Sequence, residues 1–327
     1  MPKIKYKDIK FSPLKLRLIE VMNGIIGEYQ RSGFSLTLRQ LYYQGVARDL
    51  FPQEWADKNG IVNRPENYDK LGDLLSDARL AGLVDWYAII DRGRASRATQ
   101  HYEKPSDVIK VAANSYRIDK WKDQPQYVEV WVEKEALEDV LGQACGPLDV
   151  RYFACKGYTS QTAMWEASQR LLRQQQHGKK VHIIHLGDHD PSGMDMSRDI
   201  FERLSLFVGD RVHVQRIALN MPQVERYNPP PNPAKTTDSR FAEYQQKYGD
   251  ESWELDALDP RTLVDLITRA VKQFRDETIW NEATKLEHRG RKTLDTVAKK
   301  LPSVIQFLRD LKKKENPNNQ EPDAELS

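Results

Sequence analysis

The apolar residues in the first third of the chain recur at helical spacing. One set predicts an amphipathic helix over about residues 13–31; its members are Leu18, Ile19, Met22, Ile25, Ile26 and Tyr29. Gly33 is expected to end this helix, and Thr37 is a suitable N-cap for a second helix. A third helix is expected over about residues 67–81, and WYAII predicts a short strand at 86–90.

Three helices followed by a strand and the basic segment DRGRASR predict a winged-helix (CAP-like) domain. Its third helix would read a DNA groove, yet that helix carries Asp69, Asp73 and Asp77. We therefore expect the DNA-phosphate contacts to come mainly from the arginines of the basic segment, Arg92, Arg94 and Arg97. The alternative is a small helical domain with a solvated basic loop.

The second half of the chain alternates between strands and helices. Strands are expected at 127–132, 149–154, 181–187 and 211–219, with helices at 134–144, 160–177 and 195–208 between them. Such alternation predicts a doubly wound α/β fold, a Rossmann-like parallel sheet. Ligands of these sheets bind beyond the carboxyl ends of the strands, which is where candidate chemistry is sought.

Length and charge refine this picture. The chain has 327 residues, enough for about two domains, and 50 Lys and Arg against 48 Asp and Glu. Residues 1–122 hold 21 basic and 15 acidic side chains, so a basic front and an acidic rear cancel in the net charge of +2. No apolar run is long enough to span a membrane, and no secretory signal is evident. Two cysteines and no disulfide framework favour a cytoplasmic protein.

Three carboxylates lie at the predicted strand ends. Glu133 follows the first strand, and GDHDPSG places Asp188 and Asp190 directly after the third, about 55 residues later. Oxygen ligands of this kind suit Mg²⁺. The alternative is that Asp190 only caps the next helix and Glu133 lies at a helix N-terminus, where acids are common.

The motifs VEKEAL, CKGYTSQT and LGDHDPSG, in this order, resemble a Toprim domain, the metal-binding fold of topoisomerases, primases and some nucleases. With RQLYY at residues 39–43, the chain more closely resembles the topoisomerase VI A subunit and its meiotic double-strand-break relatives. The resemblance covers roughly residues 35–100 and 125–220, and is closest to the short "Mini-A" relatives of bacterial and mobile (plasmid or phage) genomes.

This resemblance implies roles for individual residues. Tyr43 would be the nucleophile, assisted by Arg39; the alternative is that Tyr42 and Tyr43 are both core aromatics. Glu133, Asp188 and Asp190 would hold one or two Mg²⁺ ions, with Glu133 also counted as catalytic. Lys156 would contact double-stranded DNA. The family acts as a homodimer in which the tyrosine of one protomer meets the metal site of its partner. No glycine-rich phosphate loop occurs in the chain, so an ATPase would have to be a separate B subunit.

Elementary chemistry supports the Arg39–Tyr43 pair. Residues four apart share a helix face, so the guanidinium can reach the phenol oxygen or a phosphate. A free phenol has a pKa near 10, so only ~10⁻³ of it is ionised at pH 7, a deficit of about 4 kcal/mol that a nearby cation partly offsets.

The sequence thus predicts three parts: a winged-helix domain with the catalytic tyrosine at 1–120, a Toprim domain at 121–275, and a C-terminal helical segment with a disordered tail at 276–327. The predicted activity is Mg²⁺-dependent DNA double-strand cleavage through a 5′-phosphotyrosyl intermediate. The alternatives are a hydrolytic Toprim nuclease of a plasmid or phage restriction system, and a non-enzymatic DNA-binding regulator.

Three weaker features remain open at this point. His189, between the two aspartates, either contacts the phosphate or a proton or is an exposed loop imidazole, and the second interpretation is favoured. Glu254 and Asp256 either join a second metal site or lie in a solvated turn, and the proline-rich segment 228–240 lies either over the site or at a dimer interface.

Overall fold

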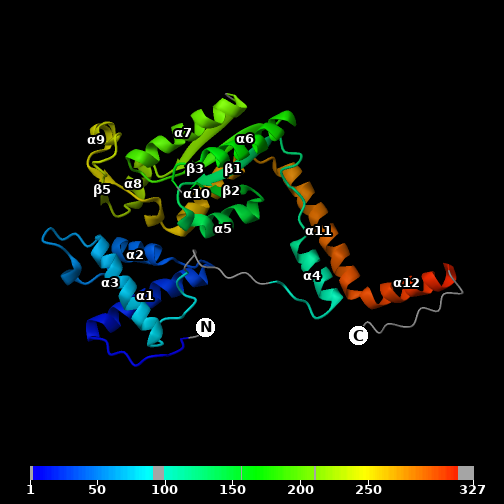
Figure 1. Cartoon of the computed structure of the whole chain (residues 1–327), viewed down its shortest axis with the longest axis horizontal. Helices are drawn as coiled ribbons and strands as arrows, with labels where there is room; N and C mark the ends of the chain where they lie inside the picture. Colours follow the sequence, from blue (N-terminus) through cyan, green and yellow to red (C-terminus); the bar gives the residue numbers. More distant parts are fainter. Residues whose placement is uncertain (1–2, 91–98, 156, 210, 316–327) are drawn as a thin grey trace. The chain divides into compact units, whose positions relative to one another are not determined.

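The computed structural model of the chain describes residues 3–90, 99–155, 157–209 and 211–315, without the side chains of 312–315 (Figure 1). It divides the chain into two compact units. The main unit comprises residues 1–95 and 125–275, and the helical unit comprises residues 96–124 and 276–327. Within the main unit we call residues 3–90 the N-terminal lobe and residues 125–275 the sheet lobe.

The N-terminal lobe is helical, as the apolar spacing predicts. Its elements are α1 (Pro13–Arg31), α2 (Leu38–Ala47), the short 3₁₀ helix η1 (Gln53–Trp55) and α3 (Pro65–Leu80). Ser12 caps α1, and a capping box between Thr37 and Gln40 begins α2. The three helices enclose one apolar core, whose fully buried members include Met22, Tyr29, Leu36, Leu41, Leu71 and Leu75.

The prediction of a strand at 86–90 is wrong. The segment forms turns, and its only ladder contact within the described residues is an isolated bridge between Ile89 and Leu36. The carboxylate of Asp85 accepts the backbone N–H of Tyr87 at 2.8 Å, which folds the chain into a local turn instead of extending it. The arginines expected on the wing, Arg92, Arg94 and Arg97, lie outside the described residues.

The sheet lobe contains a four-stranded sheet in the order β2-β1-β3-β4, with every neighbouring pair parallel. Its strands are β1 (Gln126–Val132), β2 (Arg151–Ala154), β3 (Lys180–Leu186) and β4 (Val212–Ala218). The connecting elements are η2 (Glu135–Leu137), α5 (Glu138–Leu148), α6 (Gln161–Gln176) and α7 (Pro191–Val208). The predicted α/β class and parallel sheet are therefore confirmed.

Helices cover both faces of this sheet (Figure 1). Helices α6 and α7 pack together on one face, where Trp131, Val181 and Ile183 meet their apolar sides. Helices α5 and α10 (Pro260–Lys272) pack together on the other face. Because successive strand residues point to opposite faces, Val128, Val130 and Val132 of β1 are buried on the side away from Trp131.

The chain between β4 and α10 is largely irregular, and its helices and strands are short. It contains α8 (Met221–Tyr227), β5 (Asn232–Pro233), α9 (Phe241–Tyr248), β6 (Glu251–Ser252) and the 3₁₀ turn η3 (Leu255–Ala257). Strands β5 and β6 pair antiparallel and so hold the proline-rich segment against residues 251–252. This places Glu254 and Asp256 in an ordered part of the fold.

The helical unit consists of α4 (Pro105–Ser115), α11 (Glu277–Lys299) and α12 (Leu301–Glu315). Helix α4 packs along α11, and Trp121 contacts Trp280 edge-on at 6.2 Å between ring centroids. Lys120 forms a mostly buried ion pair with Glu287 at 2.8 Å. The apolar pattern did not predict α4. Among the described helices of both units, none has the length and apolarity needed to cross a lipid bilayer.

Gly193, in the first turn of α7, allows close packing of the loop that precedes it. A Cβ added at this position would lie 2.4 Å from the carbonyl oxygen of Asp188 and 3.0 Å from Oε2 of Glu133. Backbone atoms held by a strand end and a helix start cannot withdraw easily, so a side chain here would force this loop apart.

We therefore expect Gly193→Ala to lower the free energy of unfolding by about 1–3 kcal/mol, measured by urea titration. Gly24→Ala is the matched control, since nothing lies within 4 Å of its added Cβ in the exposed middle of α1. That control should raise stability by roughly 0.5–1 kcal/mol. Equal effects of the two substitutions would contradict the packing argument.

Candidate active site at the carboxyl edge of the sheet

Glu133, Asp188 and Asp190 meet at the carboxyl edge of the sheet, as the strand ends predict. Val132 and Leu186 are paired in neighbouring parallel strands, so the residues that follow them emerge side by side. Oε2 of Glu133 accepts the backbone N–H of Asp188 at 2.9 Å. Burial and the charge of Asp190 raise the pKa of Glu133.

Asp190 also caps helix α7, as its alternative interpretation from the sequence proposed. Its Oδ1 accepts the backbone N–H of Gly193 at 2.6 Å and the hydroxyl of Ser192 at 3.1 Å. The positive end of the α7 dipole favours a carboxylate at this place. Capping occupies Oδ1, so the two interpretations of Asp190 do not exclude one another.

A partly buried arginine, Arg216, which was not predicted as a site residue from the sequence, binds the backbone of this loop. Arg216 on β4 donates to the carbonyl oxygens of four residues, at 2.6 to 3.1 Å; they are Gly187, Asp188, Gly193 and Leu219. Burial lowers the pKa of Arg216, while Glu133, Asp188 and Asp190 act in the opposite direction. The sequence did offer one signal for Arg216: it is a charged residue inside a predicted strand of a sheet that helices cover on both faces.

Lys134 lies at the centre of a group of carboxylates. Its Nζ is 3.0 Å from Asp188, 2.8 Å from Glu254 and 2.9 Å from Asp256. Burial would lower the pKa of this amine, but the three neighbouring carboxylates together raise it, so the group stays protonated. Burial raises the pKa of Asp188 and Asp256, although Lys134 opposes that shift.

Arg39 links these acids to Tyr43. Its Nη2 donates to the phenol oxygen of Tyr43 at 3.4 Å, one helical turn away, as the spacing predicts. Its Nε lies 3.1 Å from Oε2 of Glu254 and 3.1 Å from Oδ2 of Asp256, and its Nη2 forms a further close ion pair with Glu254. The contacts of Arg39 with Glu254 and Asp256 join the N-terminal lobe to the sheet lobe within one chain.

The two adjacent tyrosines of α2 have different surroundings. Tyr42 donates its O–H to the carbonyl oxygens of Val62 and Arg64, both at 3.1 Å, and so holds the loop before α3. Tyr43 instead faces Arg39 and Asn232. Burial, followed by the charge of Glu254, raises the pKa of Tyr43 to about 12, although Arg39 and a hydrogen bond with Asn232 oppose the shift.

The proline-rich segment lies against the tyrosine helix. Asn232 hydrogen bonds to Asn63 at 2.8 Å, and Asn63 also donates to the carbonyl oxygen of Pro231 at 3.0 Å. With the contact to Tyr43, these bonds place residues 231–232 beside the candidate site. The contacts of this one chain leave the other interpretation, a dimer interface, untested.

The interpretation of His189 as an exposed imidazole is wrong. The residue is fully buried, with Nδ1 2.8 Å from the hydroxyl of Tyr244, and its backbone exchanges two hydrogen bonds with Trp253. Burial lowers its pKa to about 4. Its aromatic neighbours, Tyr244, Tyr248 and Trp253, come from a segment some 60 residues later, which no local pattern could have indicated.

We call the eight residues of this network the charge cluster; its members are Arg39, Glu133, Lys134, Asp188, Asp190, Arg216, Glu254 and Asp256. Five carboxylates against three cations give a formal charge of −2 when all are ionised. Glu254 and Asp256 are therefore part of a buried ionic network and not of a solvated turn. In the described part of the chain, no three His, Cys, Asp or Glu side chains are grouped as around a bound metal ion.

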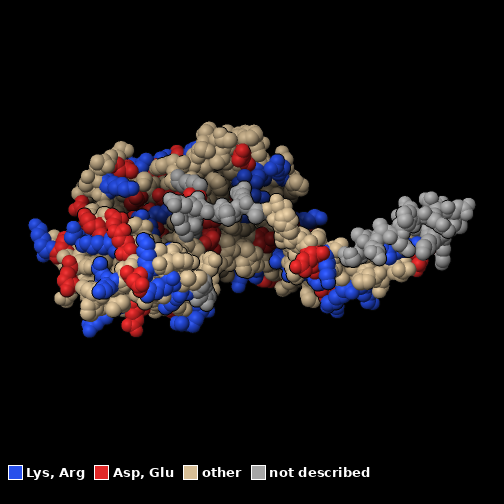
Figure 2. Space-filling model, turned by 60° about the horizontal axis from the view of Figure 1, so that its bottom comes forward, with Lys and Arg blue, Asp and Glu red and all other residues tan. Residues whose placement is uncertain are grey.

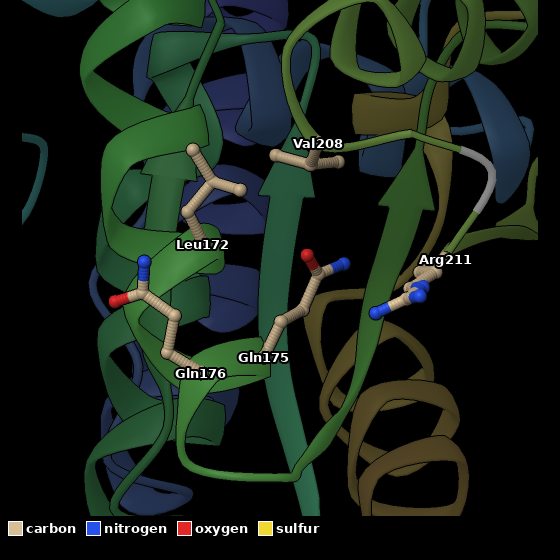
Figure 3. Close-up of a pocket in the computed structure, with 5 residues that line it drawn as sticks. All are labelled: Leu172, Gln175, Gln176, Val208 and Arg211. Atoms are coloured by element: carbon tan, nitrogen blue, oxygen red, sulfur yellow. The ribbon is translucent and has the colours of Figure 1, made fainter.

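A cavity at the opposite edge of the sheet does not belong to this site. It has a volume of about 240 Å³ and is lined by Leu172, Gln175, Gln176, Val208 and Arg211 (Figure 3). These residues lie at the ends of α6 and α7 and at the start of β4, where Arg211 and the nearby Lys179 and Lys180 line a neighbouring hollow. Cations at this edge complement the negative ends of both helix dipoles.

The expected DNA contacts are not covered by the described residues, because Lys156 lies outside them together with the three wing arginines. On the face shown in Figure 2, basic and acidic side chains are intermixed on the molecule's surface. Comparisons of the chain with models of known protein families, with curated proteins and with solved structures found no match.

His185, on β3 below the site, is completely buried, and its Nδ1 lies 2.8 Å from the hydroxyl of Ser197. Burial, followed by the charge of Arg216, lowers the pKa of His185 to about 3 from an ordinary value of 6.5. The imidazole is therefore neutral in the folded protein at pH values where it is charged in the unfolded chain.

This difference makes stability fall as the pH is lowered through 6.5, because the unfolded chain takes up a proton that the folded protein does not. Between pH 7 and pH 5 the loss from His185 should be about 2 kcal/mol. In urea titrations, His185→Gln should show a correspondingly smaller drop than the parent protein. The exposed His177→Gln is the control, and an equal drop in all three proteins would contradict the assignment.

Proposed function

We propose that the chain is a Mg²⁺-dependent DNA-cleaving transesterase, similar to the A subunit of a type IIB topoisomerase. In this proposal the N-terminal lobe is a winged-helix domain that carries the nucleophile Tyr43, and the sheet lobe is a Toprim domain. Double-stranded DNA is the substrate and a homodimer cuts both strands; an ATPase subunit would be a separate protein.

One observation carries the proposal: the tyrosine helix and the carboxylate edge form a continuous network in this fold. Tyr43 contacts Arg39, Arg39 pairs with Glu254 and Asp256, and these acids share Lys134 with Asp188. The RQLYY motif ends at residue 43, whereas the VEKEAL motif begins at residue 132 and the GDHDPSG motif at residue 187. Their meeting supports a common function for the two groups.

The proposed reaction is a phosphoryl transfer that conserves the number of phosphodiester bonds. The phenol oxygen of Tyr43 forms a bond to phosphorus as the bond from phosphorus to the 3′-oxygen breaks. The phenol loses its proton, the 3′-oxygen gains one, and the products are a 5′-phosphotyrosyl link and a 3′-hydroxyl. Arg39 would stabilise the charge that spreads over the phosphate oxygens during transfer.

The acids at the sheet edge fit a divalent cation in their chemistry. They offer only oxygen donors, and the charge cluster carries a surplus of two negative charges, which one Mg²⁺ would balance. Glu133, Asp188 and Asp190 would hold the ion, and Asp188 would exchange the Lys134 ammonium for it. Bound Mg²⁺ supplies charge neutralisation at the phosphate, in addition to that of Arg39.

The environment of Tyr43 favours a second candidate, a hydrolytic DNA nuclease. With its pKa raised to about 12, the phenol is ionised at neutral pH at a cost of about 7 kcal/mol, more than for a free phenol. In this candidate, water attacks the phosphate and Tyr43 only positions DNA. The two candidates differ in whether protein becomes attached to the cut ends.

The transesterase predicts protein covalently attached to 5′ ends when a Mg²⁺ reaction on end-labelled DNA is stopped with denaturant. Tyr43→Phe should abolish both the adduct and cutting, because the ring remains and only the nucleophilic oxygen is lost. Tyr42→Phe is the matched control and should still form adducts, although it loses hydrogen bonds to residues 62 and 64. Unattached cut ends from Tyr43→Phe would instead establish the nuclease.

Both candidates require the carboxylate edge. Asp188→Asn should reduce Mg²⁺-dependent cutting by at least about 100-fold, the order of effect seen when a group that stabilises charge in a transition state is lost. Asp265→Asn, on the exposed side of α10, should cut as the parent does. Cutting by Asp188→Asn at the parent rate would refute the assignment of this edge as the metal site.

A further inference from the structure

A single carboxylate oxygen joins Arg39, which contacts Tyr43, to Lys134. Oε2 of Glu254 accepts from Nζ of Lys134 at 2.8 Å and from Nε of Arg39 at 3.1 Å. Arg39 comes from α2 in the N-terminal lobe, and Lys134 follows β1 in the sheet lobe. An anionic oxygen is thus bound between two cations of different lobes, next to the phenol oxygen that Arg39 also contacts.

We propose that Arg39 and Lys134 form a binding site for one phosphodiester of DNA, and that the carboxylate of Glu254 fills this site in the free protein. The inference rests on the proposed function, since it assigns the substrate phosphate a place beside Tyr43. Guanidinium and ammonium groups are the usual protein partners of phosphate oxygens. A phosphodiester carries one negative charge, as the carboxylate does, so the exchange leaves the charge of the cluster unchanged.

The two acids of this segment differ in a way that suits such an exchange. The side chain of Asp256 is 1% exposed, and it contacts both Arg39 and Lys134. The side chain of Glu254 is 23% exposed, so it can turn toward solvent. When Glu254 leaves, Asp256 still holds both cations, and neither is left as an uncompensated buried charge.

The Arg39 end of the site is open to solvent. The side chain of Arg39 is 45% exposed, whereas that of Lys134 is 19% exposed. A phosphate arriving from solvent would therefore meet the guanidinium first and replace Glu254 on it, before reaching Lys134. Glu254 acts in this arrangement as a competitor that DNA must displace.

The test is DNA binding without cleavage, in EDTA and in a Tyr43→Phe background, by fluorescence anisotropy of a short labelled duplex. Glu254→Gln keeps the shape of the side chain and removes its charge, so we expect affinity to rise about tenfold. The slope of log K against log salt should stay near that of the parent, because the DNA complexes of both proteins contain the same phosphate contacts once Glu254 is displaced. Adding Arg39→Gln to this variant should remove the gain.

Two controls separate this effect from a general loss of negative charge. Glu243→Gln, on the exposed face of α9, removes the same charge and should change affinity less than twofold. Glu254→Asp keeps the charge and should not reproduce the tenfold gain. It also serves as the control for any loss of stability caused by substitution at this position, such as a lower melting temperature of Glu254→Gln. Affinity of Glu254→Gln no higher than that of Glu243→Gln would overturn the proposal.

The proposed function is tested separately, by the covalent adduct formed with Mg²⁺. Adducts together with unchanged binding by Glu254→Gln would refute the phosphate site alone. Tighter binding by Glu254→Gln without any adduct would support the phosphate site and refute the transesterase. Absence of duplex binding by both the parent and Glu254→Gln would refute the phosphate site.

Discussion

The burial of one ammonium group constrains the candidate site more than any other interaction. An ion removed from water is tolerated only where opposite charges and hydrogen bonds surround it, and Lys134 meets that requirement with Asp188, Glu254 and Asp256. These partners come from the end of β3 and from the segment before α10. A buried charge left without any partner typically costs about 3–5 kcal/mol, so the need to pair Lys134 holds the three segments together.

The sheet and the helices packed on it determine where these charged groups lie. Helices cover both faces of the sheet, and the parallel register of β1 and β3 brings Glu133 beside Asp188 at its carboxyl edge. Arg216 then donates hydrogen bonds to the carbonyl oxygens of Gly187 and Asp188, both of which are buried residues. The core thus determines where the charges gather, and the charges determine how the loops over that edge are held.

Much of the fold was predictable from local patterns. The helices of the N-terminal lobe, the capping role of Thr37 and the four parallel strands follow from apolar spacing and capping residues, because those signals act within a few residues. The strand expected at 86–90 failed because a strand needs a partner, and Asp85 offers the backbone a turn instead. Helix α4 was missed because its stability comes from packing along α11, far away in the chain.

The candidate site divides in the same way. The sequence by itself determined that Glu133, Asp188 and Asp190 share one sheet edge and that Arg39 lies one turn from Tyr43, since strand ends and helical spacing are local geometry. Only the tertiary structure decided that Lys134 and Arg39 share Glu254, that His189 is buried among aromatic rings, and that Arg216 supports the loop. Such contacts depend on the desolvation of charges from distant segments, and desolvation is known only when the chain is folded.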